Sequence, residues 1–253
     1  MLPSHRSGYG PIAIAGGDTG APLNLQKRSR LVAPFLEPHM TRLLDCGCGA
    51  GDYLLTFSAH HIEAIGVEYS FEKVRAAHRK ARRVCQGDLQ AIPFADETFD
   101  VALLNEVLEH VPNEARTLTE IHRVLSPGGR LIVFAPNRWY PFETHGVLLK
   151  SSGRKLPPHV PLIPYVPLFV GRRVFQYWAR NYWHGELRAL VMGAGFEIES
   201  RHFIWQTFEN ISGSQPRWIR RTRSVLRRLA GALERVPFLR AFGVSQVLVA
   251  RKG

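Results

Sequence analysis

Cysteine and long apolar runs are scarce in this sequence, and each scarcity excludes a class of protein. Three cysteines, Cys46, Cys48 and Cys85, are too few for a disulfide scaffold and favour a reducing compartment. No stretch of about 18 uninterrupted apolar residues occurs, so no helix that spans a bilayer is predicted. The first residues lack a charged segment followed by an apolar one, so no secretory signal is expected. Together these absences predict a cytoplasmic protein.

Acidic residues are also in short supply. The chain has 21 Asp and Glu against 33 Lys and Arg, which gives a formal net charge of +12. Such an excess suits nucleic acid, an anionic membrane or an acidic substrate. Most of these cations are arginines, which suggests some coding bias, so the location of the charge is more informative than its sum. A length of 253 residues with 45% hydrophobic content excludes a disordered or fibrous chain and suffices for one large α/β domain or two small ones.

The chain alternates short apolar runs with amphipathic segments. Buried strands are predicted at 42–46, 62–67, 99–104, 130–135, 196–206 and 245–251. Helices are predicted at about 51–60, 70–83, 113–125 and 184–193, with a weaker one at 23–38. Alternation of this kind predicts right-handed crossovers and a mainly parallel sheet covered by helices on both faces.

Three segments depart from this alternation. Residues 1–22 are rich in glycine and poor in large apolar groups, which predicts a mobile N-terminal arm before a single domain over 23–253. Residues 138–183 hold six prolines and ten aromatic residues, and are predicted to be an insertion on the acceptor side rather than more sheet. A second, basic and amphipathic insertion is predicted at about 211–243.

The strongest motif is the glycine loop over residues 45–51, which follows a strand and opens a helix. Gly47, Gly49 and Gly51 allow a tight turn and let a ligand approach the backbone with no Cβ in the way. A dinucleotide fingerprint would need a further glycine where Asp52 stands, and a carboxylate there would repel a pyrophosphate. The loop therefore favours a cationic nucleoside without phosphates.

With this loop the sequence resembles the class I methyltransferases that use S-adenosylmethionine (SAM), in particular the small-molecule group related to the quinone methyltransferases. Residues 45–51 match the family's D/E-x-G-x-G-x-G motif, and residues 93–111 and 122–137 follow its fourth and fifth strands. The resemblance is strong over 40–137 and weaker over 184–206 and 245–251. It implies a Rossmann-like three-layer sandwich, with a seven-stranded and mostly parallel sheet whose last strand is antiparallel.

The resemblance also implies which residues bind the cofactor. They are Asp45, Gly47, Gly49, Gly51, Glu68, Tyr69, Asp88, Leu89 and Asn105. Glu68 would accept hydrogen bonds from the ribose hydroxyls, Asp88 would bind the adenine amino group, and Asp45 would face the methionyl ammonium. The plainer alternatives are a solvated strand end for Glu68 and a turn cap for Asp88. A metal site at Cys46 and Cys48 would block the cofactor, so no metal ligand is predicted, and His110 is expected to pack or orient its loop.

Polar residues are dense just after the strand at 130–135. Arg138, Trp139 and Tyr140 are predicted to line the acceptor side. His145, oriented by or acting beside Glu143, is predicted to remove a proton from the acceptor. The alternative is that this cluster pins an irregular loop to the core. The aromatic content of 157–183 suggests an apolar lid for a hydrophobic acceptor, or only a small core of the insertion itself.

The positive charge is concentrated in residues 216–240, which hold eight arginines and one acid. On a helical wheel the apolar side chains fall on one side and the arginines on the other, a pattern typical of a helix that lies on anionic lipid. The alternative is a helix whose apolar face packs on the domain. Peripheral membrane contact through 216–240 is therefore one hypothesis for the partner.

Three functions are compatible with these observations. The favoured one is SAM-dependent methylation of a small or lipid-like metabolite, with a hydroxyl as the preferred acceptor. An RNA methyltransferase is a second, less favoured because residues 105–108 (NEVL) lack the N-P-P-[YF] motif and no RNA-binding module is visible. The third is a non-catalytic SAM-binding regulatory protein.

Overall fold

The computed structural model describes residues 22–58, 62–80, 83–156, 160–208 and 217–253. The arm predicted at 1–22 lies outside these ranges except for Pro22, where helix α1 (Pro22–Val32) begins. A single 3-10 turn, η1 (Ala33–Phe35), follows α1 and has Pro34 in its first positions. Proline suits the first turn of a helix because the N–H that it lacks would have no partner there.

Seven strands form one central sheet, in the order β3-β2-β1-β4-β5-β10-β9. They are β1 (Arg42–Cys46), β2 (Glu63–Glu68), β3 (Val84–Gln86), β4 (Phe99–Asn105), β5 (Leu125–Pro136), β9 (Phe196–Ile204) and β10 (Ser245–Lys252). Strand β10 runs antiparallel to both β5 and β9, and the other pairs are parallel. The predicted Rossmann-like α/β architecture with an antiparallel last strand is confirmed.

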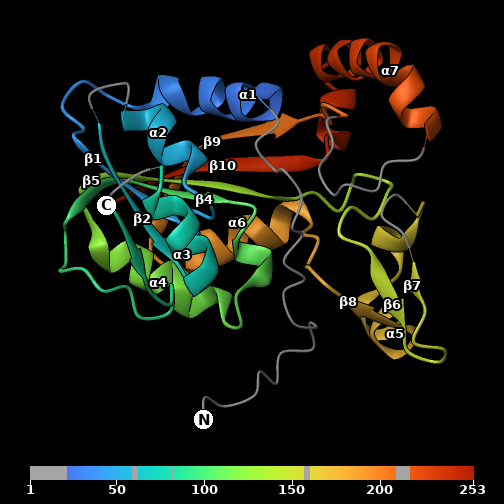
Figure 1. Ribbon diagram of the computed structural model, residues 1–253, viewed down its shortest axis with the longest axis horizontal. Coiled ribbons are helices and arrows are strands. Elements are labelled where there is room, and N and C mark those ends of the chain that lie inside the picture. Colours follow the sequence, from blue (N-terminus) through green and yellow to red (C-terminus); the bar gives the residue numbers. More distant parts are fainter. Residues whose placement is uncertain (1–21, 59–61, 81–82, 157–159, 209–216) are drawn as a thin grey trace.

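Helices cover both faces of this sheet and enclose two hydrophobic cores. The helices are α2 (Asp52–Ser58), α3 (Phe71–His78), α4 (Glu114–Val124) and α6 (His184–Gly193), besides α1. Side chains of α1, α2 and α3 pack on one face, and side chains of α4 and α6 pack on the other. Figure 1 shows α1 and α2 above the sheet and α4 and α6 below it. The result is the three-layer sandwich that the alternating pattern predicts.

Some boundaries differ from the sequence prediction. Helix α3 ends at His78 rather than near residue 83, and the residues beyond 58 in the helix predicted at 51–60 are not described. Strand β5 starts at Leu125, five residues before the predicted strand, because Phe99 already pairs with Leu125 ahead of a register shift in the β4–β5 ladder. Residues 127–129, which follow the helix predicted at 113–125, therefore lie within β5.

The insertion over 138–183 contains a small sheet, and the expectation that it adds no sheet was wrong. Strands β6 (Val147–Leu149), β7 (Lys155–Leu156) and β8 (Phe175–Tyr177) form an antiparallel sheet in the order β7-β6-β8. A 3-10 turn η3 (Ile163–Tyr165) and helix α5 (Leu168–Val174) connect β7 to β8. Buried residues from 147–177 form a hydrophobic cluster of their own beside this sheet. The sequence does not reveal the sheet because its strands have only two or three residues, too few to show an alternation of apolar and polar side chains.

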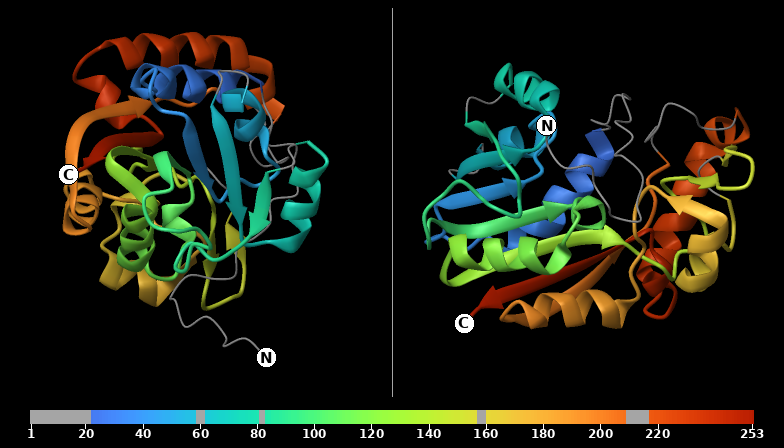
Figure 2. Two further views of the ribbon diagram at one scale, coloured as in Figure 1. Left: turned by 90° about the vertical axis from the view of Figure 1, so that its left-hand side faces the viewer. Right: turned by 90° about the horizontal axis from the view of Figure 1, so that it is seen from below.

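The basic segment forms helix α7 (Arg217–Arg235), followed by the 3-10 turn η4 (Leu239–Phe242). Helix α7 lies beside α1, as the left view of Figure 2 shows, and an ion pair joins Lys27 to Glu234 at 2.6 Å. Among the described residues, no helix is both long and apolar enough to cross a membrane. The division into an arm and one domain with two insertions stays a prediction.

Candidate cofactor and acceptor site

The glycine loop lies at the carboxyl end of β1, beside the carboxyl end of β4. Cys46 pairs with Leu104 across the two strands, and the chain order of the sheet reverses between them. The backbone N–H groups of Gly47 and Cys48 both donate to the carbonyl of Val67, at 2.7 and 3.1 Å. The loop therefore folds over the end of β2, at the switch point where open α/β sheets bind ligands.

Gly47 and Gly49 each have a structural reason to lack a side chain. Gly47 has a φ of +74°, and a Cβ there would stand 2.7 Å from a methyl group of Val107. Gly49 has a φ of +55°, and a Cβ there would meet no atom within 4 Å. Gly47 thus lets the loop contact the segment after β4, whereas Gly49 borders open space that a ligand can enter.

Glu68 ends β2 and is hydrogen-bonded to this loop. One carboxylate oxygen accepts from the backbone N–H of Gly49 at 3.0 Å, and the other accepts from that of Ser70 at 2.9 Å. The side chain is buried, whereas the next residue, Tyr69, is about half exposed, at 52%. The loop and the acid therefore form one hydrogen-bonded unit, and the alternative of a solvated strand end does not describe Glu68.

Asp45 is a buried carboxylate inside the same unit. It is 2% exposed, and its Oδ2 has no hydrogen-bond partner among the described residues. Burial raises the pKa of Asp45 to about 7, and the nearby charge of Glu68 adds to the rise. A buried anion without a partner is unstable, and a cationic ligand group at this place would stabilise it. This orphan oxygen and the open space at Gly49 both fit a nucleoside that carries an ammonium group.

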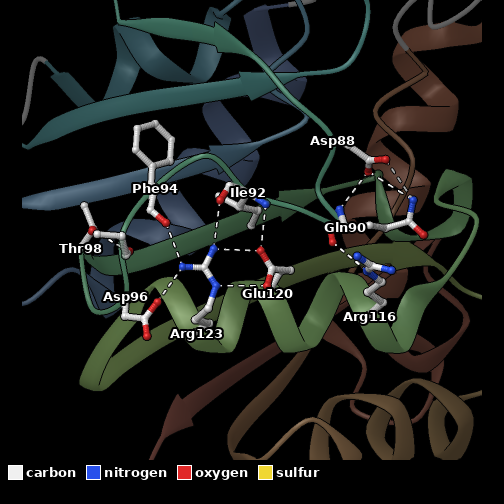
Figure 3. A network of polar contacts seen from close by, with 10 residues as sticks. Asp88, Gln90, Ile92, Phe94, Asp96, Thr98, Arg116, Glu120 and Arg123 are labelled. Atoms are coloured by element: carbon white, nitrogen blue, oxygen red, sulfur yellow. Dashed lines mark hydrogen bonds and ion pairs between the residues drawn. The ribbon is translucent and has the colours of Figure 1, made fainter.

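Asp88 and Leu89 follow β3 at the same edge of the sheet. Leu89 is buried, and the Asp88 carboxylate accepts from the backbone N–H of Gln90 at 2.9 Å, so Asp88 caps a turn. Figure 3 shows this turn and the contacts that fix the segment after it to α4. Arg123 donates to the carbonyls of Phe94 and Ile92 and pairs with Glu120. The turn that the alternative interpretation expected at Asp88 is present, and contact with adenine stays a prediction.

A buried arginine of α1 reaches this site, and the sequence interpretation missed it. Arg28 donates from Nη1 to the side chain of Asn105 and from Nη2 to Glu106 at 2.9 Å and to Ser245 at 3.1 Å. Asn105, predicted to lie at the methionine end of the cofactor, is thus held by α1. One partner, Asn24, lies four positions away on α1, but the three partners at the site are 77 or more positions away, so no local pattern around Arg28 marks its place there.

Two acids after β4 have pKa values that are shifted in opposite directions. Burial alone would raise the pKa of Glu106, but the Arg28 cation and the hydroxyl of Ser245 hold it below its usual value. Burial raises the pKa of Glu109 well above its usual value, and the charge of Glu106 adds to the rise. Glu109 lies in the 3-10 turn η2 (Leu108–His110), two residues after the Val107 that contacts the glycine loop.

The three side chains of residues 138–140, predicted to line the acceptor side, differ in their burial. Arg138 is 4% exposed and donates to the carbonyls of Pro164 and Val166, at 2.6 and 2.7 Å. Tyr140 is also buried, which raises its pKa to about 12. Trp139 is 41% exposed. Arg138 therefore pins the insertion, as the alternative interpretation expected, while contact of these residues with an acceptor stays a prediction.

His145 and Glu143 do not form the predicted pair. The Glu143 carboxylate accepts from the backbone N–H of His145 at 2.9 Å and from the amide of Asn181 at 2.9 Å, so it holds the loop and not the imidazole. The acid beside the ring is Glu109, whose Oε1 lies 4.0 Å from Nε2 of His145. The hydrogen bonds of Glu143 thus run to a backbone N–H and an amide, and the acid near Nε2 of the ring is Glu109, which the sequence interpretation did not single out. A proton-transfer role for His145 stays a prediction.

The fold and this site define a class of protein. A parallel sheet with a glycine loop after its first strand and an acid at the end of the next strand binds nucleosides. A family model described as a methyltransferase domain matches residues 44–133. The chain is 31% identical over 223 residues to an uncharacterized methyltransferase from Mycolicibacterium vanbaalenii, a match that covers 83% of this chain and 75% of that protein.

Two further relatives agree with this class. A demethylmenaquinone methyltransferase from Staphylococcus saprophyticus is 33% identical over 113 residues, which is 42% of this chain and 48% of that protein. The crystal structure of a SAM-dependent methyltransferase from Methanosarcina mazei has a TM-score of 0.58 at 18% identity, covering 87% of this chain and 96% of that one. The first four curated relatives are matched over only 30 to 50% of their own lengths. The chain belongs to the class I SAM-dependent methyltransferase family, whose cofactor is SAM.

Proposed function

We propose that this protein transfers the methyl group of SAM to a small or lipid-like metabolite, with a hydroxyl oxygen as the favoured acceptor. The observation that carries the proposal is the contact between the glycine loop and the segment after β4. Val107, which the loop approaches at Gly47, stands two residues before Glu109, and an oxygen of Glu109 lies 4.0 Å from Nε2 of His145. This proximity supports a cofactor site next to polar groups suited to an acceptor.

Residues of the glycine loop and of the segments at the ends of β2 and β3 would each bind a different part of the cofactor. SAM supplies a sulfonium whose methyl group passes to the acceptor, with the sulfur as the leaving group. Asp45 would bind the methionyl ammonium, Glu68 the ribose hydroxyls, and Asp88 with Leu89 the adenine. Methyl transfer needs an acceptor held in line behind the methyl carbon in a site with little water, so positioning is the main contribution of the protein.

The apolar surface of the insertion supports a hydrophobic acceptor. Large apolar side chains are exposed there, namely Trp139, Phe142, Leu162, Phe169, Val170 and Val174. Exposed apolar groups gathered in one insertion suit an aromatic or lipid-like molecule better than a sugar or a phosphate backbone. The name of the demethylmenaquinone methyltransferase relative gives a quinone as its acceptor, which agrees with this preference.

A survey of acceptors tests the proposal directly. Protein with methyl-labelled SAM is incubated separately with lipid extract, a metabolite pool and total RNA, and Glu68→Ala serves as the inactive control. Label is expected in the lipid or metabolite fraction and not in RNA. Label in RNA alone would support the RNA methyltransferase instead. SAM binding by calorimetry with no label in any fraction would identify a non-catalytic SAM-binding protein.

Helix α7 supports a further part of the proposal, contact with an anionic membrane. Over the part of the helix whose side chains are described, from Arg221 on, one face is exposed and carries both cations and apolar groups. These residues are Arg221, Val225, Arg228, Leu229 and Arg235, with Val236 directly after the helix. Ala230 is buried on the other side, with Leu226 and Leu233 half-buried. A helix that only packs on its domain would not need exposed valine and leucine between its arginines.

Co-sedimentation with vesicles checks this contact. We expect the protein to bind vesicles that contain anionic lipid, and the double variant Val225→Ser with Leu229→Ser to lose most of that binding. The matched control replaces Leu55 and Met192, which are exposed to a similar extent on α2 and α6, by serine. Equal sedimentation with neutral and anionic vesicles, or equal loss in both double variants, would exclude α7 as a membrane surface.

A further inference from the structure

Three potential metal ligands meet beside the cofactor loop, although the sequence interpretation assigned none. Glu109 and His110 belong to η2, and His145 comes from the insertion. One ligand atom from each residue lies within 4.8 Å of the other two. The Nε2 atoms of the two imidazoles lie 3.9 and 4.0 Å from the same oxygen of Glu109, and the rings are 5.4 Å apart.

The carboxylate of this cluster lacks the partners that a buried acid needs. The Glu109 side chain is 0% exposed, and among the described residues neither of its oxygens has a hydrogen-bond donor. The nearby cation, Arg28, is bound to Glu106, Asn105 and Ser245 instead. Buried polar atoms are almost always paired, so two orphan oxygens on one carboxylate that faces two imidazoles indicate a missing partner.

The surroundings of His145 favour a cation as that partner. The hydroxyl of Thr144 lies 3.1 Å from Nδ1 of His145, and the tautomer in which Nδ1–H donates to this hydroxyl leaves Nε2, the atom near Glu109, to offer its lone pair. Histidines that bind metals commonly have their other ring nitrogen hydrogen-bonded in this way. We propose that Glu109, His110 and His145 bind one divalent transition-metal ion.

Two imidazoles and one carboxylate form a ligand set suited to zinc and the neighbouring divalent ions, more than to magnesium. Three protein ligands leave open positions on the ion, as in catalytic metal sites. The site lies on the acceptor side of the loop, next to Val107. It is therefore placed to take a hydroxyl oxygen of the acceptor, a role that rests on the proposed function.

In that role the ion lowers the pKa of the hydroxyl that it binds. The O–H bond breaks and the proton passes to water. An oxygen lone pair then forms the bond to the methyl carbon, while the carbon–sulfur bond breaks and its electron pair remains on sulfur. The products are the methyl ether and S-adenosylhomocysteine, and no oxidant or reductant is needed. His145 then acts as a metal ligand and not as the general base expected from the sequence.

Metal binding is measured on the whole protein, independently of methyl transfer. Chelator-treated protein is titrated with Zn²⁺ by calorimetry and with Co²⁺ by visible absorption, and one ion per chain is expected. Thr144→Val should weaken binding about 10- to 100-fold, as losses of such supporting contacts do. Glu109→Gln and His145→Ala should weaken it more. His202→Ala, on β9 and outside the cluster, is the matched control and should bind as the wild type does.

The outcomes separate this inference from the proposed function. No binding of Zn²⁺ or Co²⁺, or equal binding by His145→Ala, overturns the metal site. Binding of Mg²⁺ that depends on Glu106 and Glu109 but not on the two histidines also overturns the proposed site. Thermal unfolding of each variant shows whether a loss is local or global. If chelator-treated protein keeps full methyl transfer, the metal role falls and the proposed function stands. If one ion binds but no acceptor is methylated, the metal site stands and the proposed function falls.

Discussion

Replacing Gly49 by leucine is expected to reduce the affinity for SAM or S-adenosylhomocysteine by about 100-fold or more. A Cβ at Gly49 meets no protein atom within 4 Å, so a leucine there would extend into the open space where we propose that the cofactor binds. Overfilling a packed site costs about 1–3 kcal/mol, and a leucine that must share its volume with a ligand lies at the upper end. Isothermal titration of the purified variant measures the loss.

Gly153 provides the matched control for this prediction. It also has a positive φ, +66°, and a Cβ there also meets nothing within 4 Å, but it lies in the turn between β6 and β7. Gly153→Leu should therefore incur the same backbone strain, about 1–2 kcal/mol, and keep its affinity for the cofactor. Equal affinities in the two leucine variants would show that Gly49 does not border the cofactor.

Replacing Asp45 by asparagine is expected to weaken SAM binding while it changes the pH dependence of folding. The ammonium of SAM would pair with the ionised form of Asp45, whose pKa is raised to about 7 by burial. Affinity in the wild type should therefore fall as the pH drops below 7, by up to about tenfold per unit. The asparagine side chain of the variant has no charge to lose, so its weaker binding should not vary over this range. Titrations between pH 6 and 8.5 test both statements.

The free protein should show the opposite trend in stability. The folded pKa of Asp45, about 7, is higher than its ordinary value of 3.8, so between these values the folded state holds a proton that the unfolded state has lost. This contribution to the free energy of unfolding is complete below pH 4 and is lost as the pH rises to 7, by at most about 1.4 kcal/mol per unit. Asp45→Asn should lack this decline.

Thermal unfolding at pH 5 and pH 8 measures that difference. Asp45→Asn should gain stability relative to the wild type between the two values, whereas Asp96→Asn, at an exposed carboxylate, should not. A wild type and an Asp45→Asn variant with parallel pH profiles would mean that Asp45 is not held as a destabilised anion. The same carboxylate would then have no energetic reason to attract the cofactor's ammonium.

The sequence predicts the central sheet and the position of the glycine loop well because both rest on local patterns. A buried strand is a continuous apolar run, and the glycine loop over 45–51 and Glu68 at the end of β2 are fixed by the spacing within one β–α–β unit. The small sheet of the insertion escapes prediction because its strands have two or three residues, too few for a period of two to be visible.

The acceptor side is harder to predict because its contacts join distant segments. Glu143 and His145 are neighbours in the sequence, and their proximity suggested a pair, yet the imidazole faces Glu109 from η2. Arg28 binds partners 77, 78 and 217 positions away. Such pairs depend on how α1, the sheet and the insertion dock, and no spacing within a single segment records that docking.

The position of Ser245 has a consequence for the order in which the protein matures. Ser245 begins β10, which pairs with β5 on one side and β9 on the other, and its hydroxyl binds both Arg28 and Glu106. A ribosome releases α1 and β4 long before it releases β10. Until then β5 and β9 have no strand between them, and the Arg28–Glu106 pair lacks its third member. The nascent chain can therefore form its cofactor loop early, whereas the acceptor side is completed only after the last strand is inserted.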